Sequence, residues 1–204
     1  MSDPLSAPLL AHLVDVPLSA FLALLLLFAA GHKLWRPAAA GRAVIALTRM
    51  DAMPNGGLPT RVAVIGAVAA ALGETLAAVL ILIPAHRVVG AALAVVIWLA
   101  YLALLARAVR SGRTLVDCGC SFGAMHRPLG AFQLGRTLGL AVLAAVVGGL
   151  ARLAAGVAPA VTAAWPATAA IDGSAGLAAL TLLVLYGALD QAMSLGPLQT
   201  GNSP

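Results

Sequence analysis

Charged side chains are scarce in this 204-residue chain, at 9% of all residues. Soluble globular proteins carry about 25%, so these residues cannot build a water-facing surface. The apolar share is 62% and the mean hydropathy is +1.02. Aromatic residues are also few, at 4%, and they form no regular alternation with the basic residues, which argues against nucleic-acid binding. These shortages predict a multi-pass protein of the cell membrane.

Most of the chain consists instead of long apolar runs. Since a lipid bilayer admits only helices and closed barrels, and the runs lack the alternation of a β-strand, the expected fold is an all-α transmembrane bundle. About five runs are long enough to cross a bilayer, with four possible. Together they form one domain over residues 1–204. The expected spans are 17–35, 61–83, 88–108, 134–155 and 176–191.

Small residues are frequent in the second and fourth expected spans, which favours close helix packing. These small residues include Gly66, Ala69, Ala70, Gly73, Gly135 and Gly139, and no single one of them is a specific contact signal in so alanine-rich a chain. Acidic rather than basic residues precede the first apolar run, so we expect a retained span rather than a cleaved signal peptide.

Lysine and arginine cluster in two of the four loops between the expected spans. With five spans, this bias places the N-terminus outside, the C-terminus inside and the third loop, 109–133, on the cytoplasmic side. The second loop has only Arg87 and the fourth only Arg152. The basic residues of the first loop are Lys33, Arg36, Arg42, Arg49 and Arg61, and those of the third are Arg107, Arg110, Arg113, Arg127 and Arg136.

Cysteine is limited to Cys118 and Cys120, which stand one residue apart in the third loop. Thiolates are the nucleophiles of disulfide exchange, and two neighbouring thiols can form a reversible disulfide. Gly119 between them admits backbone angles that relieve so small a ring. A strained disulfide is more easily reduced, hence more oxidising toward a partner. The pair is therefore the candidate catalytic centre of thiol–disulfide exchange, in which one cysteine forms a mixed disulfide and the other resolves it.

Residues near these cysteines would shift the pKa of their thiols. His126 and Arg127 would favour the thiolate, whereas Asp117 would oppose it. Two other interpretations stay open. The cysteines could be inert packing residues, or they could hold Cu(I) together with Met125 or His126. Structural zinc would need four ligands, and we assign no metal.

Glu74 lies near the middle of the second expected span, where a carboxylate is costly unless it is paired, protonated or facing a cavity. Its role is either a structural hydrogen bond to a neighbouring helix or a functional one, as a proton relay or as the partner of Lys33 or a bound ligand. Lys33, at the end of the first span, could instead extend to the interface. Arg136, which opens the fourth span, could bind a lipid headgroup or meet Glu74.

The order of these features resembles the MauE family of methylamine-utilisation membrane proteins, within the wider DoxX-like group. The family pattern reads Cys-Gly-Cys-Phe-Gly, and here Ser121 separates Cys120 from Phe122. The other matching pieces are an Ala-Gly-x-Lys end to the first span (Ala30, Gly31, Lys33), a glutamate in the second (Glu74) and a fourth span that opens with Arg136.

The resemblance implies a role in maturing the disulfide-rich small subunit of methylamine dehydrogenase, with a thioredoxin-fold partner. We assign no cofactor, although a quinone would suit the chemistry as electron acceptor. The alternative is a non-enzymatic membrane assembly factor or a soft-metal scaffold. Disulfide maturation belongs to the extracytoplasmic side, whereas the charge pattern places the cysteines inside. A re-entrant apolar run, or electron transfer across the bundle from cytoplasmic thiols, would reconcile the two.

Overall fold

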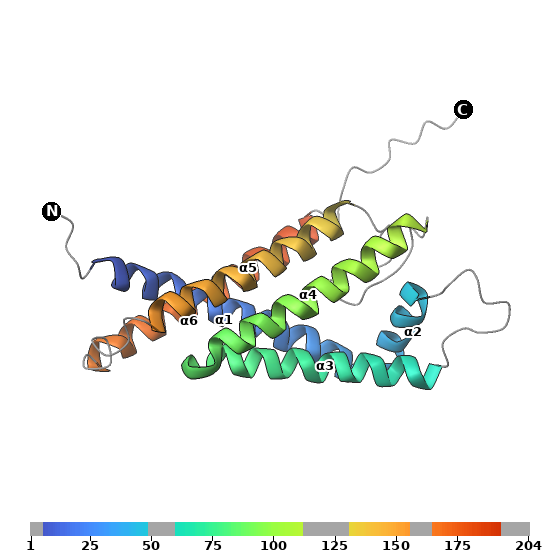
Figure 1. Cartoon of the computed structure of the whole chain (residues 1–204), viewed down its shortest axis with the longest axis horizontal. Helices are drawn as coiled ribbons and strands as arrows, with labels where there is room; N and C mark the ends of the chain where they lie inside the picture. Colours follow the sequence, from blue (N-terminus) through green and yellow to red (C-terminus); the bar gives the residue numbers. More distant parts are fainter. Residues whose placement is uncertain (1–5, 49–59, 112–130, 156–164, 193–204) are drawn as a thin grey trace, which may run out of the picture.

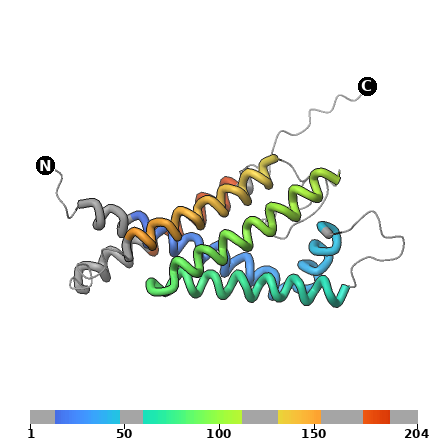
Figure 2. Tube along the Cα trace, viewed as in Figure 1, coloured from blue at the N-terminus to red at the C-terminus, as the bar shows by residue number. Residues whose placement is uncertain are grey.

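The computed structural model describes the backbone of residues 6–48, 60–111, 131–155 and 165–192 (Figure 1). Side chains are described for residues 14–47, 60–111, 131–153 and 176–189, the coloured parts of Figure 2. The described backbone residues form six α-helices and one 3-10 turn, with no strand among them, which confirms the all-α prediction. The elements are α1 (Ser6–Trp35), α2 (Pro37–Thr48), α3 (Thr60–Leu82), the 3-10 turn η1 (Pro84–His86), α4 (Arg87–Arg110), α5 (Ala131–Ala155) and α6 (Trp165–Ala192).

Four of these helices are long and apolar enough to cross a membrane. The segments that qualify are Val14–Trp35, Thr60–Leu82, Pro84–Arg110 and Ala131–Leu153, each close to an expected span. The fifth expected span falls within α6, whose apolar part, Gly176–Leu189, is shorter than the other four. The count of about five spans is compatible with this arrangement when α6 is included.

Helix α1 begins well before Pro17, where the first span was expected to start. Proline removes a backbone hydrogen bond and usually ends or kinks a helix, yet Pro17 lies inside α1. Polar contacts support the chain at this point, since Ser19 donates a hydrogen bond of 3.3 Å to Asp15, one turn away in the same helix.

Helix α2 occupies part of what the charge pattern treats as a simple loop. It opens on Pro37, and proline at the first helical position costs nothing because the first-turn N–H groups have no partner within the helix. Alanines follow directly, and they have the highest helix propensity of all residues. At 12 residues, α2 is too short to span a bilayer, which takes about 20.

The long helices form an antiparallel bundle (Figure 1). Helix α1 packs along α3, α3 along α4 and α4 along α5, while α6 packs against α1. Helix α2 lies across one end of the bundle, against α3 and α4. At this end of the bundle, α1 and α4 end and α3 and α5 begin. We call it the arginine-rich end, after Arg36, Arg42, Arg61, Arg107 and Arg110.

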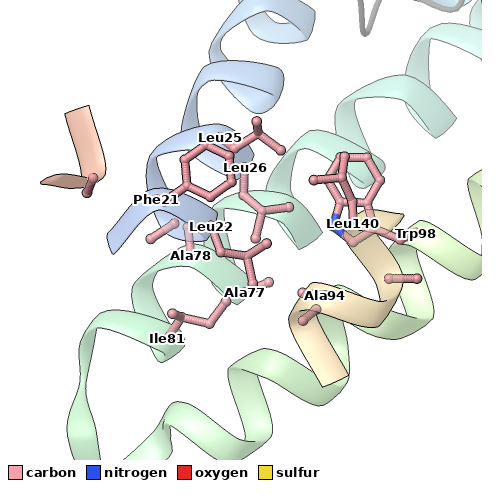
Figure 3. Close-up of a cluster of buried hydrophobic side chains, with 14 residues drawn as sticks. Phe21, Leu22, Leu25, Leu26, Ala77, Ala78, Ile81, Ala94, Trp98 and Leu140 are labelled. Atoms are coloured by element: carbon pink, nitrogen blue, oxygen red, sulfur yellow. The ribbon is translucent and has the colours of Figure 1, made fainter. Parts of the chain in front are cut away.

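The core is a cluster of small and branched apolar side chains in the middle of the bundle. Figure 3 shows the α1 side chains facing α3, with Trp98 from α4 and Leu140 from α5 closing the other side. Alanines provide much of the helix contact, which lets the backbones approach closely. The labelled α1 and α3 members are Phe21, Leu22, Leu25, Leu26, Ala77, Ala78 and Ile81.

The glycines that make close contacts are not those expected from the sequence. No neighbouring atom lies within 4 Å of a Cβ built on Gly66, Gly135 or Gly139, and the one on Gly73 meets only ordinary contact. Gly90 is different, because its Cβ would lie 2.5 Å from the backbone nitrogen of Ile81. The turn from α3 into α4 therefore depends on a glycine that the pattern of small residues did not distinguish.

Candidate functional site

Three helices bring Lys33, Glu74 and Tyr101 together inside the bundle. The Lys33 ammonium, near the end of α1, donates hydrogen bonds to both carboxylate oxygens of Glu74 on α3, at 2.6 and 2.8 Å. The Tyr101 hydroxyl of α4 donates to Glu74 Oε1 at 2.6 Å. The ammonium also lies 5.2 Å from the centre of the Tyr101 ring, within the range of a cation–π contact. Glu74 is thus held by one helix on each side of its own.

This cluster is shielded from the surroundings. Glu74 is 0% exposed and Lys33 is 7% exposed. Removing a charge from water costs several kcal/mol per ion even after relaxation, about as much as a well-formed ion pair and its hydrogen bonds return. The three hydrogen bonds on the carboxylate therefore offset its burial, and they join α1, α3 and α4 at a single point.

Trp98 extends the aromatic side of this cluster. Its ring packs edge-on against Tyr101, with 6.0 Å between the ring centres and 77° between the planes. The Trp98 Nε1–H is buried with no hydrogen-bond partner, the only such side-chain atom found in the described part of the chain. An unpaired buried donor costs roughly 1–3 kcal/mol, so the packing around Trp98 has to offset this penalty.

Arg136 and Tyr186 form a second polar contact, between α5 and α6. The Arg136 Nε–H donates to the Tyr186 hydroxyl, and the guanidinium lies 4.9 Å from the centre of the tyrosine ring. Phe21 of α1 meets the same ring edge-on, at 6.0 Å and 70°. Arg136 therefore helps to hold α6 onto the bundle, while Glu74 is engaged by Lys33 and Tyr101.

An ion pair near the opposite end was not anticipated from the sequence. Asp15 of α1 pairs with Arg87 at the start of α4. Arg87 also donates a hydrogen bond of 3.1 Å to the Ile81 carbonyl in the last turn of α3. The signal for this pair was present, since Arg87 is the lone cation of its loop and Asp15 stands just before the expected first span. From the sequence, Tyr101 is interpreted only as a packing or interfacial aromatic residue, whereas its hydroxyl binds Glu74.

The candidate cysteines lie outside the described residues. This also holds for the supporting residues expected around them, which are Asp117, Gly119, His126 and Arg127. The flanking helices are described, however. Leu105 and Ala108 of α4 form a small apolar cluster with Leu134 of α5 and with Ala46 and Leu47 of α2. The cysteine-bearing segment therefore leaves α4 and enters α5 at neighbouring points of the arginine-rich end.

The described residues contain no group of three or more His, Cys, Asp or Glu side chains that could hold a metal ion. What they do contain is a buried carboxylate fully supplied with hydrogen-bond donors. Such a carboxylate can hold helices in register or accept a proton. The number and shortness of its contacts favour the structural role.

Replacing Tyr101 by phenylalanine should lower the free energy of unfolding by about 1.5–3 kcal/mol, the usual worth of a hydrogen bond to a charged group. The reason is that Glu74 loses one of its three hydrogen bonds, while the aromatic ring and its packing stay. Denaturant titration of the purified protein in detergent measures the change. Thr181→Val is the control, because the Thr181 hydroxyl bonds only to its own helix, at Leu177, on an exposed face. Equal stability of the two variants would contradict the expectation.

Comparison with known proteins provides one match. The family model for methylamine utilisation protein MauE matches residues 9–151, from the first half of α1 almost to the end of α5. No curated protein and no solved structure matches the chain. The match includes Lys33, Glu74, Tyr101, Arg136 and the cysteine-bearing segment, and it leaves out α6. By this match and its membrane-spanning helices, the chain belongs to the MauE family and is a multi-pass membrane protein of methylamine utilisation.

Proposed function

We propose that this MauE-family protein exchanges thiols and disulfides with a thioredoxin-fold partner through Cys118 and Cys120. In this way it assists disulfide formation in an extracytoplasmic client, which the family assignment suggests is the small subunit of methylamine dehydrogenase. The observation that carries the proposal is that the chain's only two thiols stand one residue apart, in the segment that joins two packed helices.

The packing of the helices on either side of this segment supports exchange with a protein partner. Helices α4 and α5 pack against each other, and the apolar cluster around Leu105 and Ala108 holds their ends and α2 together. The segment that carries the cysteine pair is thereby connected at both ends to helices that pack against each other. The two cysteines would carry out the redox chemistry, and the helices would keep the segment at one end of the bundle.

The exchange balances in thiols and electrons. A thiolate of the reduced partner attacks the Cys118–Cys120 disulfide, forming a mixed disulfide and releasing one cysteine as a thiolate. The second partner thiol resolves the mixed disulfide, so the partner leaves oxidised and the pair is left as a dithiol. A membrane quinone is the class of acceptor that would restore the disulfide, taking up two electrons and two protons.

Serine at Cys118 or Cys120 should abolish this exchange. We expect the client's disulfide content to fall at least tenfold, because neither single thiol can complete both steps. Neither variant should form a mixed disulfide with the reduced partner, because the disulfide that the partner thiolate attacks can no longer form. The measurement is the redox state of the client's cysteines by alkylation and non-reducing electrophoresis, at matched levels of the membrane protein.

Ser121→Ala is the matched control, since it removes a hydroxyl from the same segment and leaves both thiols. Normal client disulfides in both cysteine variants would refute exchange and favour a non-enzymatic assembly factor. Labelling of intact cells with a membrane-impermeant maleimide, before and after reduction, tests the sidedness. Labelling only after reduction indicates an exposed extracytoplasmic disulfide, against the charge pattern. Labelling only in permeabilised cells indicates cytoplasmic thiols and requires an electron relay across the bundle.

A further inference from the structure

Among the residues whose side chains are described, exposed charge is of one kind. The carboxylates there, Asp15 and Glu74, are buried in ion pairs, and the lysine, Lys33, is buried with Glu74; Asp172 and Asp190 of α6 are not among these residues. The exposed charged side chains among them are all arginines, and all but Arg152 belong to the arginine-rich end. They are Arg36, Arg42, Arg61, Arg107 and Arg110.

Helix α2 brings these arginines into one region. Gly41 sits so close to α3 that a Cβ there would lie 2.6 Å from the side chain of Val64. Arg42 and Arg61 therefore flank the place where α2 meets α3. At its other end α2 packs, through Ala46 and Leu47, against the cluster of Leu105 and Ala108 on α4, and Arg107 and Arg110 flank Ala108 in the sequence. The short helix thus lies among helix ends that carry arginines (Figure 1).

The aromatic residue next to α2 places this region at the lipid boundary. Trp35 ends the first span, is 87% exposed and directly precedes Arg36. Exposed tryptophan is characteristic of the headgroup level of a bilayer. A helix too short to span, with an exposed tryptophan at its start, lies along the interface. The arginines therefore stand where lipid phosphates are.

From this arrangement we infer that the arginine-rich end binds the headgroups of anionic phospholipids. Guanidinium groups pair with phosphate oxygens through two parallel hydrogen bonds. Clustered arginines repel one another unless anions lie between them. An anionic leaflet supplies such anions at the level of Trp35. The inference does not depend on thiol exchange, and the cysteine-to-serine variants should keep this lipid preference.

Quenching of Trp35 fluorescence tests this inference. A Trp98→Phe/Trp165→Phe variant keeps Trp35 as its only tryptophan and is reconstituted into phosphatidylcholine vesicles. Brominated phosphatidylglycerol and brominated phosphatidylcholine are then compared as quenchers at equal mole fraction. The expected preference for the anionic lipid is about fivefold, the factor that one arginine contributes near an anionic surface. Adding Arg36→Gln and Arg42→Gln should bring the ratio close to one, whereas Arg152→Gln should leave it unchanged.

Salt provides a second readout that needs no arginine variant. Raising sodium chloride should reduce the preference, because interfacial arginines remain within reach of screening ions. Equal quenching by the two lipids at low salt would overturn the inference. Loss of the preference with inorganic phosphate, but not with chloride of the same ionic strength, would assign the arginines to a soluble phosphate compound and would also overturn it. A preference that persists in the Arg36→Gln/Arg42→Gln variant would do the same.

Discussion

Glu74→Ala is expected to be the most damaging single substitution in the bundle, lowering the free energy of unfolding by about 3–5 kcal/mol. The substitution leaves the Lys33 ammonium, 7% exposed, without its counter-ion, and it leaves the Tyr101 hydroxyl without the acceptor that it bonds at 2.6 Å. An unpaired charge at this depth has neither water nor carboxylate to stabilise it. The measurement is unfolding of the purified protein in mixed micelles as the denaturing detergent fraction rises.

An apolar replacement of the whole cluster distinguishes the loss of the ion pair itself from the cost of leaving the buried Lys33 ammonium unpaired. Lys33→Met, Glu74→Met and Tyr101→Phe together remove the charges and the hydroxyl, and we expect this variant to recover most of the lost stability, since apolar substitutes for a buried pair are often neutral. Arg152→Gln, which removes an exposed charge, should change stability by less than about 0.5 kcal/mol. A triple variant as unstable as Glu74→Ala would mean that the cluster contributes a net attraction of its own.

Gly90→Ala is expected to have the next largest effect, a loss of about 3 kcal/mol, the upper end for overpacking. The added Cβ would lie 2.5 Å from Ile81 N and 2.8 Å from the Leu80 carbonyl carbon. Backbone atoms cannot rotate out of the way, so α3 and α4 would have to separate. Because Arg87 bonds to the Ile81 carbonyl in the same turn, separation would also strain its contact with Asp15.

Gly139→Ala is the matched control for this substitution. Its Cβ meets no atom within 4 Å, so only helix propensity changes, and alanine exceeds glycine there by about 1 kcal/mol. Unfolding of the two variants under identical conditions should therefore shift in opposite directions. Comparable stability of Gly90→Ala and Gly139→Ala would show that the α3–α4 contact adapts easily.

Hydropathy predicted the helices well because in lipid every apolar run must satisfy its own backbone hydrogen bonds. The first four spans were placed to within a few residues, and Glu74 was singled out because a carboxylate is so rare at that depth. The sequence did not predict α2, since 12 residues that include an arginine produce no span signal. It also did not distinguish Gly90 from Gly66, because helix phase alone does not say which small residue meets another backbone.

The partners of the polar residues were less predictable than their positions. The sequence offered Lys33 as one of several partners for Glu74, and the direction of each side chain depends on how α1 and α3 are rotated about their axes. Tyr101 was interpreted as a packing or interfacial residue, since nothing in a single sequence indicates which hydroxyl faces a carboxylate. The function of Cys118 and Cys120 stays a prediction from their spacing, because they lie outside the described residues.

The two ion pairs have a consequence for the order in which the protein is made. Helix α1 leaves the ribosome first and carries both Asp15 and Lys33, whose partners Arg87 and Glu74 belong to segments synthesised later. During that interval the first helix holds two unneutralised charges at membrane depth, which is costly. Arrival of the α3–α4 hairpin neutralises both. A nascent chain that stalls before Arg87 therefore keeps an unpaired carboxylate on α1.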